Sequence, residues 1–483
     1  MKIAVIGAGP AGWAASSKLV ELGHEITVFV GNLTSNSIDN LDFKSANKKL
    51  NLKLLHGSNY PYRHFPTGPR KIQLGVNLPS SFAFSGLSLV WGATMLPYND
   101  RDLQQWPIST SDLDAGYKYL LDKIPITGRH DGLTDAFRAY FNQGALFPTK
   151  RILNFFEMAS QLDVEGLFIG SARLAVQTKT RMENGCNYCG KCLIGCPTDK
   201  IWFSPQISNG KINYIKNFRI LSIIEGEKTI SLNAIDMSGE ETTFSGFDKV
   251  LIGAGNTETF RILAQSNMVP PEAINKDSAT FFIPFLLSRK YGPAEKYKNT
   301  LSQAFIRYET ADSKSIQLQI YDYSDDLITR AKNALPLGKY IPSSILKFFL
   351  ARLFVGIGYL DSQYSSEIQM RLESNGDVSL HKGRDESATQ KLVISQFLAN
   401  SKNLLENTGL RPLRHLIQHA LPGEGVHSGG WLPMGVSCDV AGRPHGTSRV
   451  HVIDSSTFPT IPAGAITYTV MANAVRIAEL VAL

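Results

Sequence analysis

The first thirty residues of the chain constrain its fold more than any other stretch. Lys2–Ile6 is a short apolar run rich in branched residues, which is typical of a buried parallel strand. Gly7, Gly9 and Gly12 follow at once in the pattern G-x-G-x-x-G, and a helical stretch leads to a second apolar run, Glu25–Val30. In a βαβ unit such glycines permit a tight turn and let the helix amino terminus approach a pyrophosphate. The stretch therefore predicts a bound dinucleotide rather than an ordinary glycine-rich turn.

The end of the second run departs from the usual pattern of dinucleotide-binding folds. An Asp or Glu at this point would hold a ribose hydroxyl, but the chain has Val30, Gly31 and Asn32 there. Either Asn32 or backbone groups make this contact, or the adenosine end is held in another way. Because the acidic residue is missing, the motif alone does not identify the nucleotide.

Length and composition narrow the class of protein. At 483 residues the chain exceeds what one hydrophobic core usually supports, so two structural domains are expected. The net charge of +7 arises from scattered Lys and Arg residues without a basic stripe, which argues against nucleic-acid binding. Gly7 and Gly9 interrupt the apolar amino terminus, so it is not expected to be a signal peptide. A cytoplasmic location follows, in which cysteines are more often metal ligands or catalytic groups than disulfides.

The periodicity of apolar residues predicts several kinds of structure along the chain. Residues 125–180 show helical spacing and are expected to be mostly helical. From 279 to 380 strict alternation dominates, with a hairpin turn at Asn375–Gly376, and this predicts an antiparallel sheet inserted into an α/β domain. Helices are expected at 387–407 and, at the end of the chain, at 469–480.

One nearly apolar segment, 341–360, carries Lys347 and Arg352 in its interior and Pro342 near its start. Two central charges and a proline argue against a membrane-spanning helix. The segment is expected to form a buried helix or a flap over the pocket. The alternative is an interfacial helix that gives the protein a peripheral membrane contact.

The carboxyl-terminal part of the chain carries the most specific patterns. The stretches 442–464 and 467–473, with Phe-Pro-Thr in the first of them, resemble the carboxyl-terminal signature of the glucose-methanol-choline (GMC) oxidoreductases, a family of FAD enzymes. The stretch 426–435 resembles the active-site histidine loop of that family. The stretch 251–263 resembles the second glycine motif of the family, and 85–106 resembles the stretch that passes over the flavin in its sugar-dehydrogenase branch. These motifs follow one another along the chain in the order that the family has.

The resemblance implies an α/β fold, α+β overall, in which a Rossmann-like FAD-binding domain contains an inserted antiparallel-sheet substrate domain. The discontinuous FAD-binding domain is expected at 1–124, 181–265 and 420–483, a helical insertion at 125–180, and the substrate-binding domain at 266–419. The substrate domain carries no legible motif, so the sequence does not identify the substrate.

The resemblance also implies roles for individual residues. His427 matches the family's catalytic base, which takes a hydroxyl proton while a hydride leaves the adjacent carbon for flavin N5. The opposing interpretation is a structural histidine with satisfied hydrogen bonds. The expected FAD-binding residues are Gly7, Gly9, Gly12, Asn32, Trp91, Gly92, Gly253, Gly255, Asp454 and Thr467. Some relatives attach FAD through a histidine where this chain has Val90, so the FAD is expected to be non-covalent.

One position departs from the family pattern. His or Asn usually follows the Phe-Pro-Thr segment as a partner for the active-site histidine, and this chain has Ala465 there. A second hydrogen bond to the substrate then comes from another residue or from the substrate itself. Otherwise the reaction differs from simple alcohol oxidation, or it runs in the reductive direction.

Four of the five cysteines form a C-x2-C-x2-C-x3-C-P run, namely Cys186, Cys189, Cys192 and Cys196. This is the run of bacterial ferredoxins, in which thiolates hold an iron–sulfur cluster. The fourth cysteine of such a run can serve a second cluster, and there is no second run here. A three-cysteine [3Fe–4S] cluster and a [4Fe–4S] cluster completed by Cys196 or Cys438 therefore both remain open. A zinc site and metal-free thiols are the alternatives.

These features together predict an FAD-dependent dehydrogenase that oxidises a CH–OH group of a sugar, glycoside or other alcohol. Electrons are expected to leave the flavin through the iron–sulfur cluster to an electron-acceptor protein or a quinone, rather than to oxygen. The alternative is a flavin-dependent reductase or a non-redox lyase with structural cysteines, which the missing partner at Ala465 allows. A third interpretation is a non-enzymatic redox or binding protein that keeps these motifs as scaffold.

Overall fold

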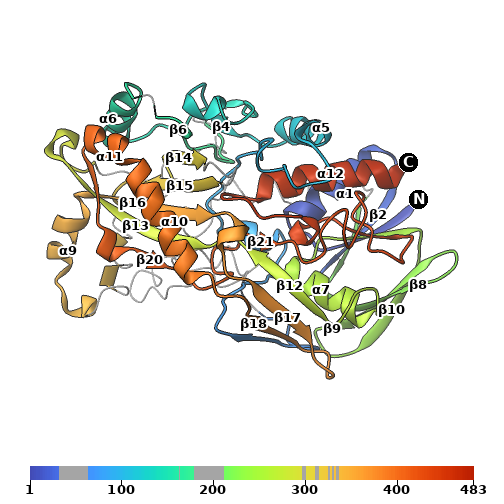
Figure 1. Ribbon diagram of the computed structural model, residues 1–483. Coiled ribbons are helices and arrows are strands. Elements are labelled where there is room, and N and C mark those ends of the chain that lie inside the picture. The colour runs from blue at the N-terminus through green and yellow to red at the C-terminus, as the bar shows by residue number, and fades with distance from the viewer. Residues whose placement is uncertain are drawn as a thin grey trace.

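The computed structural model describes the chain in several ranges, which are residues 1–31, 62, 64–162, 164–178, 212–295, 301–309, 315–324, 327–328, 331–332 and 337–483. Its α-helices include α1 (Pro10–Glu21), α5 (Thr110–Leu121), α6 (Lys150–Ala159), α7 (Asn256–Gln265), α9 (Ser343–Leu350), α10 (Ser387–Asn400), α11 (Lys402–Thr408) and α12 (Thr467–Ala482). Short 3₁₀ helices are η2 (Gly86–Val90), η3 (Gly132–Thr134), η6 (Arg289–Tyr291), η7 (Gly338–Tyr340), η8 (Ser362–Tyr364), η9 (Arg414–Leu416) and η10 (Ser455–Thr457). Figure 1 shows how these elements are arranged.

A five-stranded parallel sheet carries the amino-terminal glycine motif. Its order is β22 (Val450–Val452), β11 (Lys249–Ile252), β1 (Lys2–Ile6), β2 (Glu25–Val30) and β7 (Ile212–Lys216). Because β1 and β11 are parallel neighbours, Gly7 and Gly253 follow them at the same edge of the sheet, where a doubly wound fold binds its nucleotide. The predicted strands and the Rossmann-like unit are confirmed.

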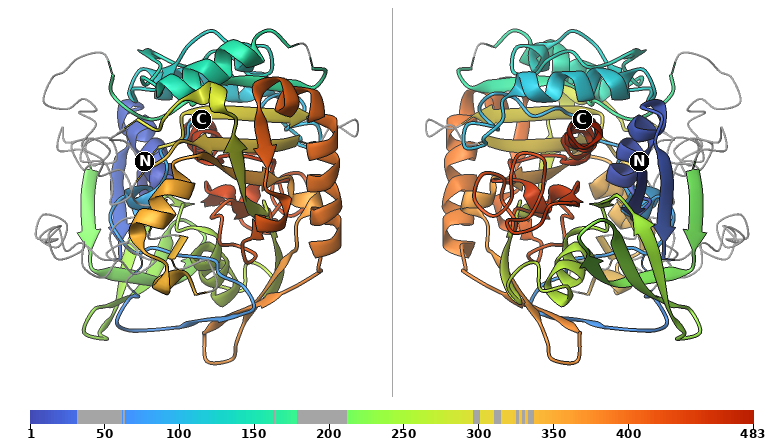
Figure 2. Two further views of the ribbon diagram at one scale, coloured as in Figure 1. Left: turned by 90° about the vertical axis from the view of Figure 1, so that its left-hand side faces the viewer. Right: turned by 90° about the vertical axis from the view of Figure 1, so that its right-hand side faces the viewer.

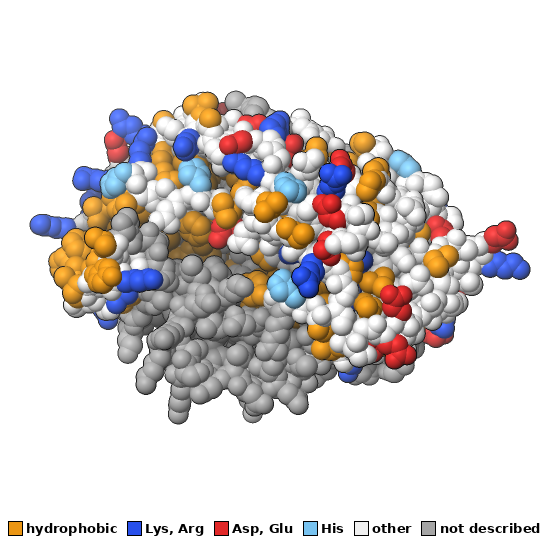
Figure 3. All heavy atoms as spheres, turned by 90° about the horizontal axis from the view of Figure 1, so that it is seen from below, with side chains coloured by type: hydrophobic (Ala, Val, Ile, Leu, Met, Phe, Trp, Pro, Cys, Tyr) orange, Lys and Arg blue, Asp and Glu red, His pale blue; other side chains and the backbone are white. Residues whose placement is uncertain are grey.

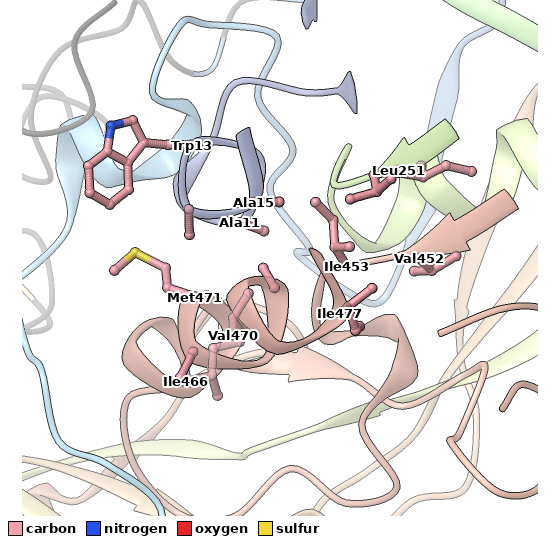
Figure 4. Packing of buried hydrophobic residues seen from close by; sticks show 14 of the residues in the cluster. Ala11, Trp13, Ala15, Leu251, Val452, Ile453, Ile466, Val470, Met471 and Ile477 are labelled. Atoms are coloured by element: carbon pink, nitrogen blue, oxygen red, sulfur yellow. The ribbon is translucent and has the colours of Figure 1, made fainter. Parts of the chain in front are cut away.

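Helices α1 and α12 lie side by side against this parallel sheet. In Figure 4, Ala11 and Ala15 are on the side of α1 that faces Met471 and Ile477 of α12. These small alanine side chains let the two helix axes approach closely. Helix α5 crosses α12 in the same way, because a Cβ on Gly116 would lie 2.4 Å from the Ala472 carbonyl oxygen. The carboxyl-terminal helix is thus built into the nucleotide-binding half, as predicted.

The inserted part is an antiparallel sheet, here called the substrate sheet. Its order is β19 (Leu410–Pro412), β13 (Thr280–Leu287), β16 (Leu353–Leu360), β15 (Ser315–Tyr321), β14 (Ala304–Glu309) and β6 (Leu167–Ser171), and β20 (Gln418–His419) pairs with β13. Its apolar face packs on α6, α10 and α11 and forms a second core. The predicted fold class, a Rossmann-like domain with an antiparallel insertion, is confirmed.

Besides the pair of β4 (Thr127–Gly128) and β5 (Gln143–Gly144), two further sheets complete the described part of the fold. One is the meander β8 (Phe218–Glu225), β9 (Ile230–Asp236) and β10 (Glu241–Phe247). The other has the order β21 (Ser428–Gly429), β12 (Glu272–Asp277), β17 (Ile368–Leu372), β18 (Val378–Lys382) and β3 (Lys71–Leu74). The hairpin between β17 and β18 turns at Gly376 with φ +83°, as the Asn-Gly pair predicted. In both views of Figure 2 the red carboxyl-terminal segment lies in the middle of the molecule.

The expectation that residues 125–180 are mostly helical is wrong. The described part of this range contains one α-helix, α6, together with the strands β4 (Thr127–Gly128), β5 (Gln143–Gly144) and β6. Gly128 and Gly144 interrupt the helical spacing, and a Cβ on Gly128 would lie 2.5 Å from the Phe141 ring. Strand β6 pairs with β14, so tertiary pairing overrides the local periodicity here.

The apolar segment 341–360 does not form one continuous helix, so the expectation of a single buried or interfacial helix over this range is wrong, while a flap over the pocket stays a prediction. It splits into α9, in which Leu346 is the buried residue, and the strand β16. Gly356 and Gly358 in β16 have no side chains, and the Phe281 ring lies 2.1 Å from where a Cβ of Gly358 would be. None of the helices in the described ranges is long and apolar enough to cross a membrane. The predicted helix 387–407 is present, but it divides into α10 and α11.

Candidate active site

The first glycine turn is closed by backbone contacts that exclude side chains. Gly7 has φ +103°, and a Cβ there would lie 2.4 Å from the Gly253 carbonyl oxygen. A Cβ on Gly12 would lie 1.9 Å from the Gly7 carbonyl oxygen. Around Gly9, by contrast, no atom lies within 4 Å of the corresponding position. The turn is therefore closely packed on its inner side and open above the amino terminus of α1, which fits a pyrophosphate group.

The segment that contains Trp91 and Gly92 crosses this turn. The Ser85 backbone nitrogen donates to the Ala8 carbonyl oxygen at 3.0 Å, and η2 then leads to Trp91. A Cβ on Gly92 would lie 3.9 Å from the Tyr321 hydroxyl of β15. Trp91 and Gly92 thus lie between the first glycine turn and the substrate sheet. The structure brings these predicted residues together, and their contact with the flavin stays a prediction.

Asp454 joins the second glycine turn to the carboxyl-terminal loop. Its Oδ2 accepts hydrogen bonds from the Gly255 backbone nitrogen at 2.9 Å and from the Thr259 hydroxyl at 2.6 Å. Its Oδ1 accepts one from the Ser456 backbone nitrogen at 3.0 Å. Burial raises the pKa of this carboxyl, while the hydrogen bonds oppose the rise. Asp454 therefore holds the turn around Gly253 and Gly255 in place beside the expected cofactor.

His427 lies at the junction of the nucleotide half and the substrate sheet. The Ser278 backbone nitrogen donates to its carbonyl oxygen at 2.8 Å, and the preceding Val426 has a φ of +62°, which is unfavourable for a β-branched residue. The imidazole packs on the Tyr359 ring, with the ring centroids 4.5 Å apart and an interplanar angle of 32°. This strained placement holds the ring in a single position against the substrate sheet.

The electrostatics of His427 favour a neutral imidazole. Desolvation lowers its pKa to about 4, so the ring is uncharged at neutral pH. Its Nδ1 is buried and has no hydrogen-bond partner among the described residues. A structural histidine of this kind normally has a partner. Nδ1 could therefore accept a hydrogen bond from a group that the described residues do not supply.

The loop that precedes α12 is held by residues from distant segments. Arg307 of β14 donates to the Ala463 carbonyl oxygen at 2.9 Å and to Asp102 Oδ1 at 2.6 Å, and this ion pair is buried. The Trp106 indole nitrogen donates to the Thr460 hydroxyl at 2.8 Å. Arg307 and Asp102 were not recognised from the sequence, because no local motif marks a pair of residues that distant segments bring together.

The loop ends at the two positions singled out in the sequence, Ala465 and Thr467. Ala465 is buried and offers no polar side-chain atom, and Thr467 is the first residue of α12. The residue before it, Ile466, gives this helix terminus no side-chain cap. The first backbone N–H groups of α12 therefore lack the usual side-chain acceptor. The predicted contact of Thr467 with FAD is compatible with this geometry and stays a prediction.

Several predicted ligands lie outside the described residues, namely Asn32, Cys186, Cys189, Cys192 and Cys196. Within the described ranges, no group of three His, Cys, Asp or Glu side chains could hold a metal ion.

The fifth cysteine, Cys438, is a buried core residue whose Sγ donates to the Leu432 carbonyl oxygen at 3.2 Å. Burial raises its pKa to about 12, which disfavours the thiolate that a cluster ligand needs. Its surroundings therefore do not favour a role as a remote fourth ligand.

The fold resembles solved structures along almost its whole length. Pyridoxine 4-oxidase from Mesorbium loti superposes with a TM-score of 0.64 at 14% identity, with 99% of this chain and 98% of that chain covered. Formate oxidase superposes with a TM-score of 0.66 at 12% identity and 99% and 97% coverage. An FAD-dependent oxidoreductase from Chaetomium thermophilum superposes with a TM-score of 0.61 at 13% identity and 99% and 98% coverage. At such identities the likeness establishes the fold, which is that of FAD-dependent oxidoreductases.

Sequence comparison adds a match over the carboxyl-terminal part of the chain. Residues 380–474 match the family model described as GMC oxidoreductase, and this range includes His427, Asp454 and the loop before α12. A comparison with curated protein sequences finds no match. Residues 380–474 therefore carry a GMC oxidoreductase domain, and the resemblance of the carboxyl-terminal signature is confirmed.

Proposed function

We propose that the protein is an FAD-dependent dehydrogenase that oxidises a CH–OH group of a small alcohol or sugar. The observation that carries the proposal is the neutral imidazole of His427. Its Nδ1 has no partner among the described residues, and the ring is fixed on Tyr359 at the junction of the two halves. A hydroxyl group placed there can transfer its proton to this ring.

The residues of the nucleotide half fit FAD. The open space above Gly9 and the amino terminus of α1 suit the pyrophosphate, and Trp91 and Gly92 suit the ring that accepts electrons. Val90 offers no nucleophile for a covalent link, so the cofactor is non-covalent in this proposal. When bound, FAD supplies the acceptor for a hydride.

In the proposed reaction the protein's own groups handle the proton and the orientation. His427 takes the hydroxyl proton, while the hydrogen on the adjacent carbon leaves with its electron pair, so the alcohol becomes an aldehyde or ketone. A pKa of about 4 makes the imidazole a weak base at neutral pH. Proton transfer is therefore expected to accompany loss of the hydride rather than to precede it.

The test is flavin bleaching without oxygen. Purified protein is mixed anaerobically with a panel of alcohols, namely benzyl alcohol, pyridoxine, glycerol and D-glucose, and the flavin absorbance is followed. We expect at least one panel member to bleach the flavin, and His427→Ala to slow bleaching by a factor of about 10²–10⁴ with FAD still bound. Wild-type rates in His427→Ala, or no bleaching by any panel member, would count against the proposal.

A reductase or a lyase is the second candidate, and Ala465 is the observation that favours it. This position carries no polar side chain that could assist His427. A lyase would convert its substrate while the flavin stays oxidised, and a reductase would reoxidise flavin that had been reduced chemically. The same anaerobic spectra therefore separate the candidates.

We further propose that Cys186, Cys189, Cys192 and Cys196 hold an iron–sulfur cluster that passes electrons to an acceptor protein or quinone. The support is the ferredoxin-type spacing in the sequence, since these residues lie outside the described ranges. A reducing cytoplasm would keep these thiols available. Iron and acid-labile sulfide, assayed after anaerobic purification, should reach about three to four per chain. If the purified protein contained flavin but no iron, this route for electrons to leave the flavin would be ruled out.

The surface around α9 suits a peripheral membrane contact. Phe348 and Phe349 are 57% and 59% exposed, and Lys347 and Arg352 flank them. Figure 3 shows hydrophobic side chains gathered at this end of the molecule, with Lys and Arg side chains beside them. Such a surface favours the boundary of an anionic bilayer. Co-sedimentation with phosphatidylserine vesicles, but not with phosphatidylcholine vesicles, tests this, and Phe348→Ser should weaken it.

A further inference from the structure

One row of side chains crosses the substrate sheet below the candidate active site. Tyr359 pairs across the strands with Thr280 on one side and with Gln317 on the other, and Gln317 pairs in turn with Arg307. Paired residues of antiparallel strands point to the same face of the sheet, about 5 Å apart. The row Thr280, Tyr359, Gln317 and Arg307 therefore forms a continuous line on the face opposite the second apolar core.

Each member of this row contacts one of the two loops that shape the site. A Cβ on Gly425 would lie 2.0 Å from the Thr280 hydroxyl, and the His427 ring packs on Tyr359.

The other two members lie under the loop that precedes α12. A Cβ on Gly464 would lie 2.0 Å from Gln317 Oε1, and Arg307 donates to the Ala463 carbonyl oxygen. Gln317 thus lies between Tyr359, which supports His427, and Arg307, which anchors the loop that ends at Ala465.

The amide of Gln317 has no partner. The residue is 1% exposed, and neither Oε1 nor Nε2 makes a hydrogen bond to any described residue. Its neighbour in the row, Arg307, makes two, and Gln319 on the same strand accepts one from the Tyr321 hydroxyl at 3.0 Å. A buried polar group without a partner costs about 1–3 kcal/mol. Such a cost is tolerated where another molecule completes the hydrogen bonds.

We infer that Gln317 is a substrate-binding residue of this site, and that its amide hydrogen-bonds the substrate next to the group that His427 deprotonates. The inference rests on the proposed function of His427. The amide has two donor hydrogens and one acceptor oxygen, so it suits a hydroxyl, an ether or a carbonyl oxygen on the substrate. The substrate class is therefore an alcohol with an oxygen within hydrogen-bond reach of both side chains.

The positions that flank the loop strengthen this assignment. Gly464 has no side chain and a φ of +121°, so only backbone covers the amide, and Ala465 supplies no polar atom of its own. Within this row, Thr280 and Arg307 already donate to backbone carbonyls, and Tyr359 is covered by His427. In Gln317 both polar atoms of the side chain are buried and lack a hydrogen-bond partner among the described residues.

The experiment uses the holoenzyme and the panel alcohol that bleaches the wild-type flavin fastest. The dependence of the anaerobic bleaching rate on alcohol concentration gives a dissociation constant and a limiting rate. Gln317→Met keeps the length of the side chain but removes both functions, and we expect it to raise the dissociation constant ten- to a hundredfold. Gln319→Met, two residues away on the same buried face, is the matched control and should change it less than threefold.

Stability separates binding from a merely structural role. Gln317→Met should melt within about 2 °C of wild type and retain FAD, because it removes two groups that had no partner in the protein. Gln317→Asn, which keeps the amide but withdraws it by one methylene, should also raise the dissociation constant and guards against misfolding of the Met variant. A dissociation constant within threefold of wild type in both variants would overturn the assignment. So would a loss of FAD or of melting temperature that accompanies the weaker binding.

His427→Ala, measured in the same series, tests the proposed function independently. If it is inactive while both Gln317 variants bind the alcohol as wild type does, the Gln317 assignment alone fails. If it bleaches at the wild-type rate, the proposed role of His427 fails, and Gln317 is still judged by its effect on the dissociation constant.

Discussion

The two halves of the molecule position their candidate ligand-binding groups by opposite means. In the nucleotide half, the glycines of the first turn have no side chains. The backbone of Gly7 therefore packs closely against Gly253, while the space above Gly9 stays open. In the substrate half, single polar side chains on antiparallel strands, Arg307 and Gln317, reach up to loops from elsewhere in the chain. The glycine turn depends on residues that are close together in the sequence. The polar side chains of the substrate sheet depend on residues that only the pairing of strands brings together.

This difference suggests a division of labour. A turn made of backbone atoms tolerates few substitutions, because a side chain added at Gly7 or Gly12 would collide with a carbonyl group. A row of side chains on a sheet can be altered one residue at a time without moving the strands. Changes in the nucleotide half are therefore expected to abolish folding or cofactor binding, whereas changes in the substrate half alter stability or substrate binding in a graded way.

The largest effect is expected at Gly12. Gly12→Ala would place a Cβ 1.9 Å from the Gly7 carbonyl oxygen, so the turn must open, at a cost of about 5 kcal/mol in the free energy of unfolding. Gly9→Ala is the matched control, because Gly9 has φ −78° and no atom lies within 4 Å of the added carbon. Its apoprotein should melt as wild type does, while FAD titration shows weaker binding. Unchanged FAD affinity in Gly9→Ala would mean that the pyrophosphate does not lie against Gly9.

A somewhat smaller effect is expected from breaking the buried pair in the substrate half. Arg307→Met leaves the Asp102 carboxylate buried without its cation and should lower the free energy of unfolding by about 3–5 kcal/mol. Urea denaturation measures the change. The double variant Arg307→Met/Asp102→Leu removes both charges and should recover part of the loss. A double variant no more stable than Arg307→Met would show that the contact with Ala463, rather than the ion pair, carries the effect.

A pH-dependent effect is expected at Asp277, whose Oδ2 accepts a hydrogen bond from the Gly423 backbone nitrogen below the His427 loop. Burial raises its pKa from 3.8 to about 7, so between these values the folded state holds a proton that the unfolded state has lost. The wild-type free energy of unfolding therefore falls as pH rises through this range, by about 4 kcal/mol from this group. Asp277→Asn mimics the protonated form. Its melting temperature relative to wild type should rise from pH 5 to pH 8, and a flat difference would contradict the assignment.

The smallest effect is expected where a side chain only supports the carboxyl-terminal loop. Trp106→Phe removes the hydrogen bond to the Thr460 hydroxyl but keeps an aromatic ring against Phe458, whose centroid lies 4.5 Å away. The loss should be about 1 kcal/mol in the free energy of unfolding. A double-mutant cycle with Thr460→Val isolates this hydrogen bond. A coupling energy near zero would mean that ring packing alone holds the loop.

Local sequence patterns predicted the nucleotide half and the resemblance to the GMC oxidoreductases. The strand, glycine turn and helix of the first thirty residues obey local rules of spacing and conformation, and the structure has them as predicted. The carboxyl-terminal signature indicated the GMC oxidoreductases, whose family model matches residues 380–474. The loop 426–435 indicated His427 as the base, and this role stays a prediction. Alternation of side chains also predicted the antiparallel insertion, because a strand with one buried face repeats every two residues.

Where local periodicity and long-range strand pairing disagree, the tertiary structure follows the strand pairing. Residues 125–178 have helical spacing, but β6 joins the substrate sheet beside β14, and the apolar segment 341–360 continues from α9 into β16. Gln317 and Arg307 likewise come to lie beside the candidate site because β15 lies next to β14 and under the loop before α12. Nothing near either residue in the sequence marks such a role. The physical reason is that register between strands is set by packing of the whole sheet, while a glycine turn is set by its own backbone.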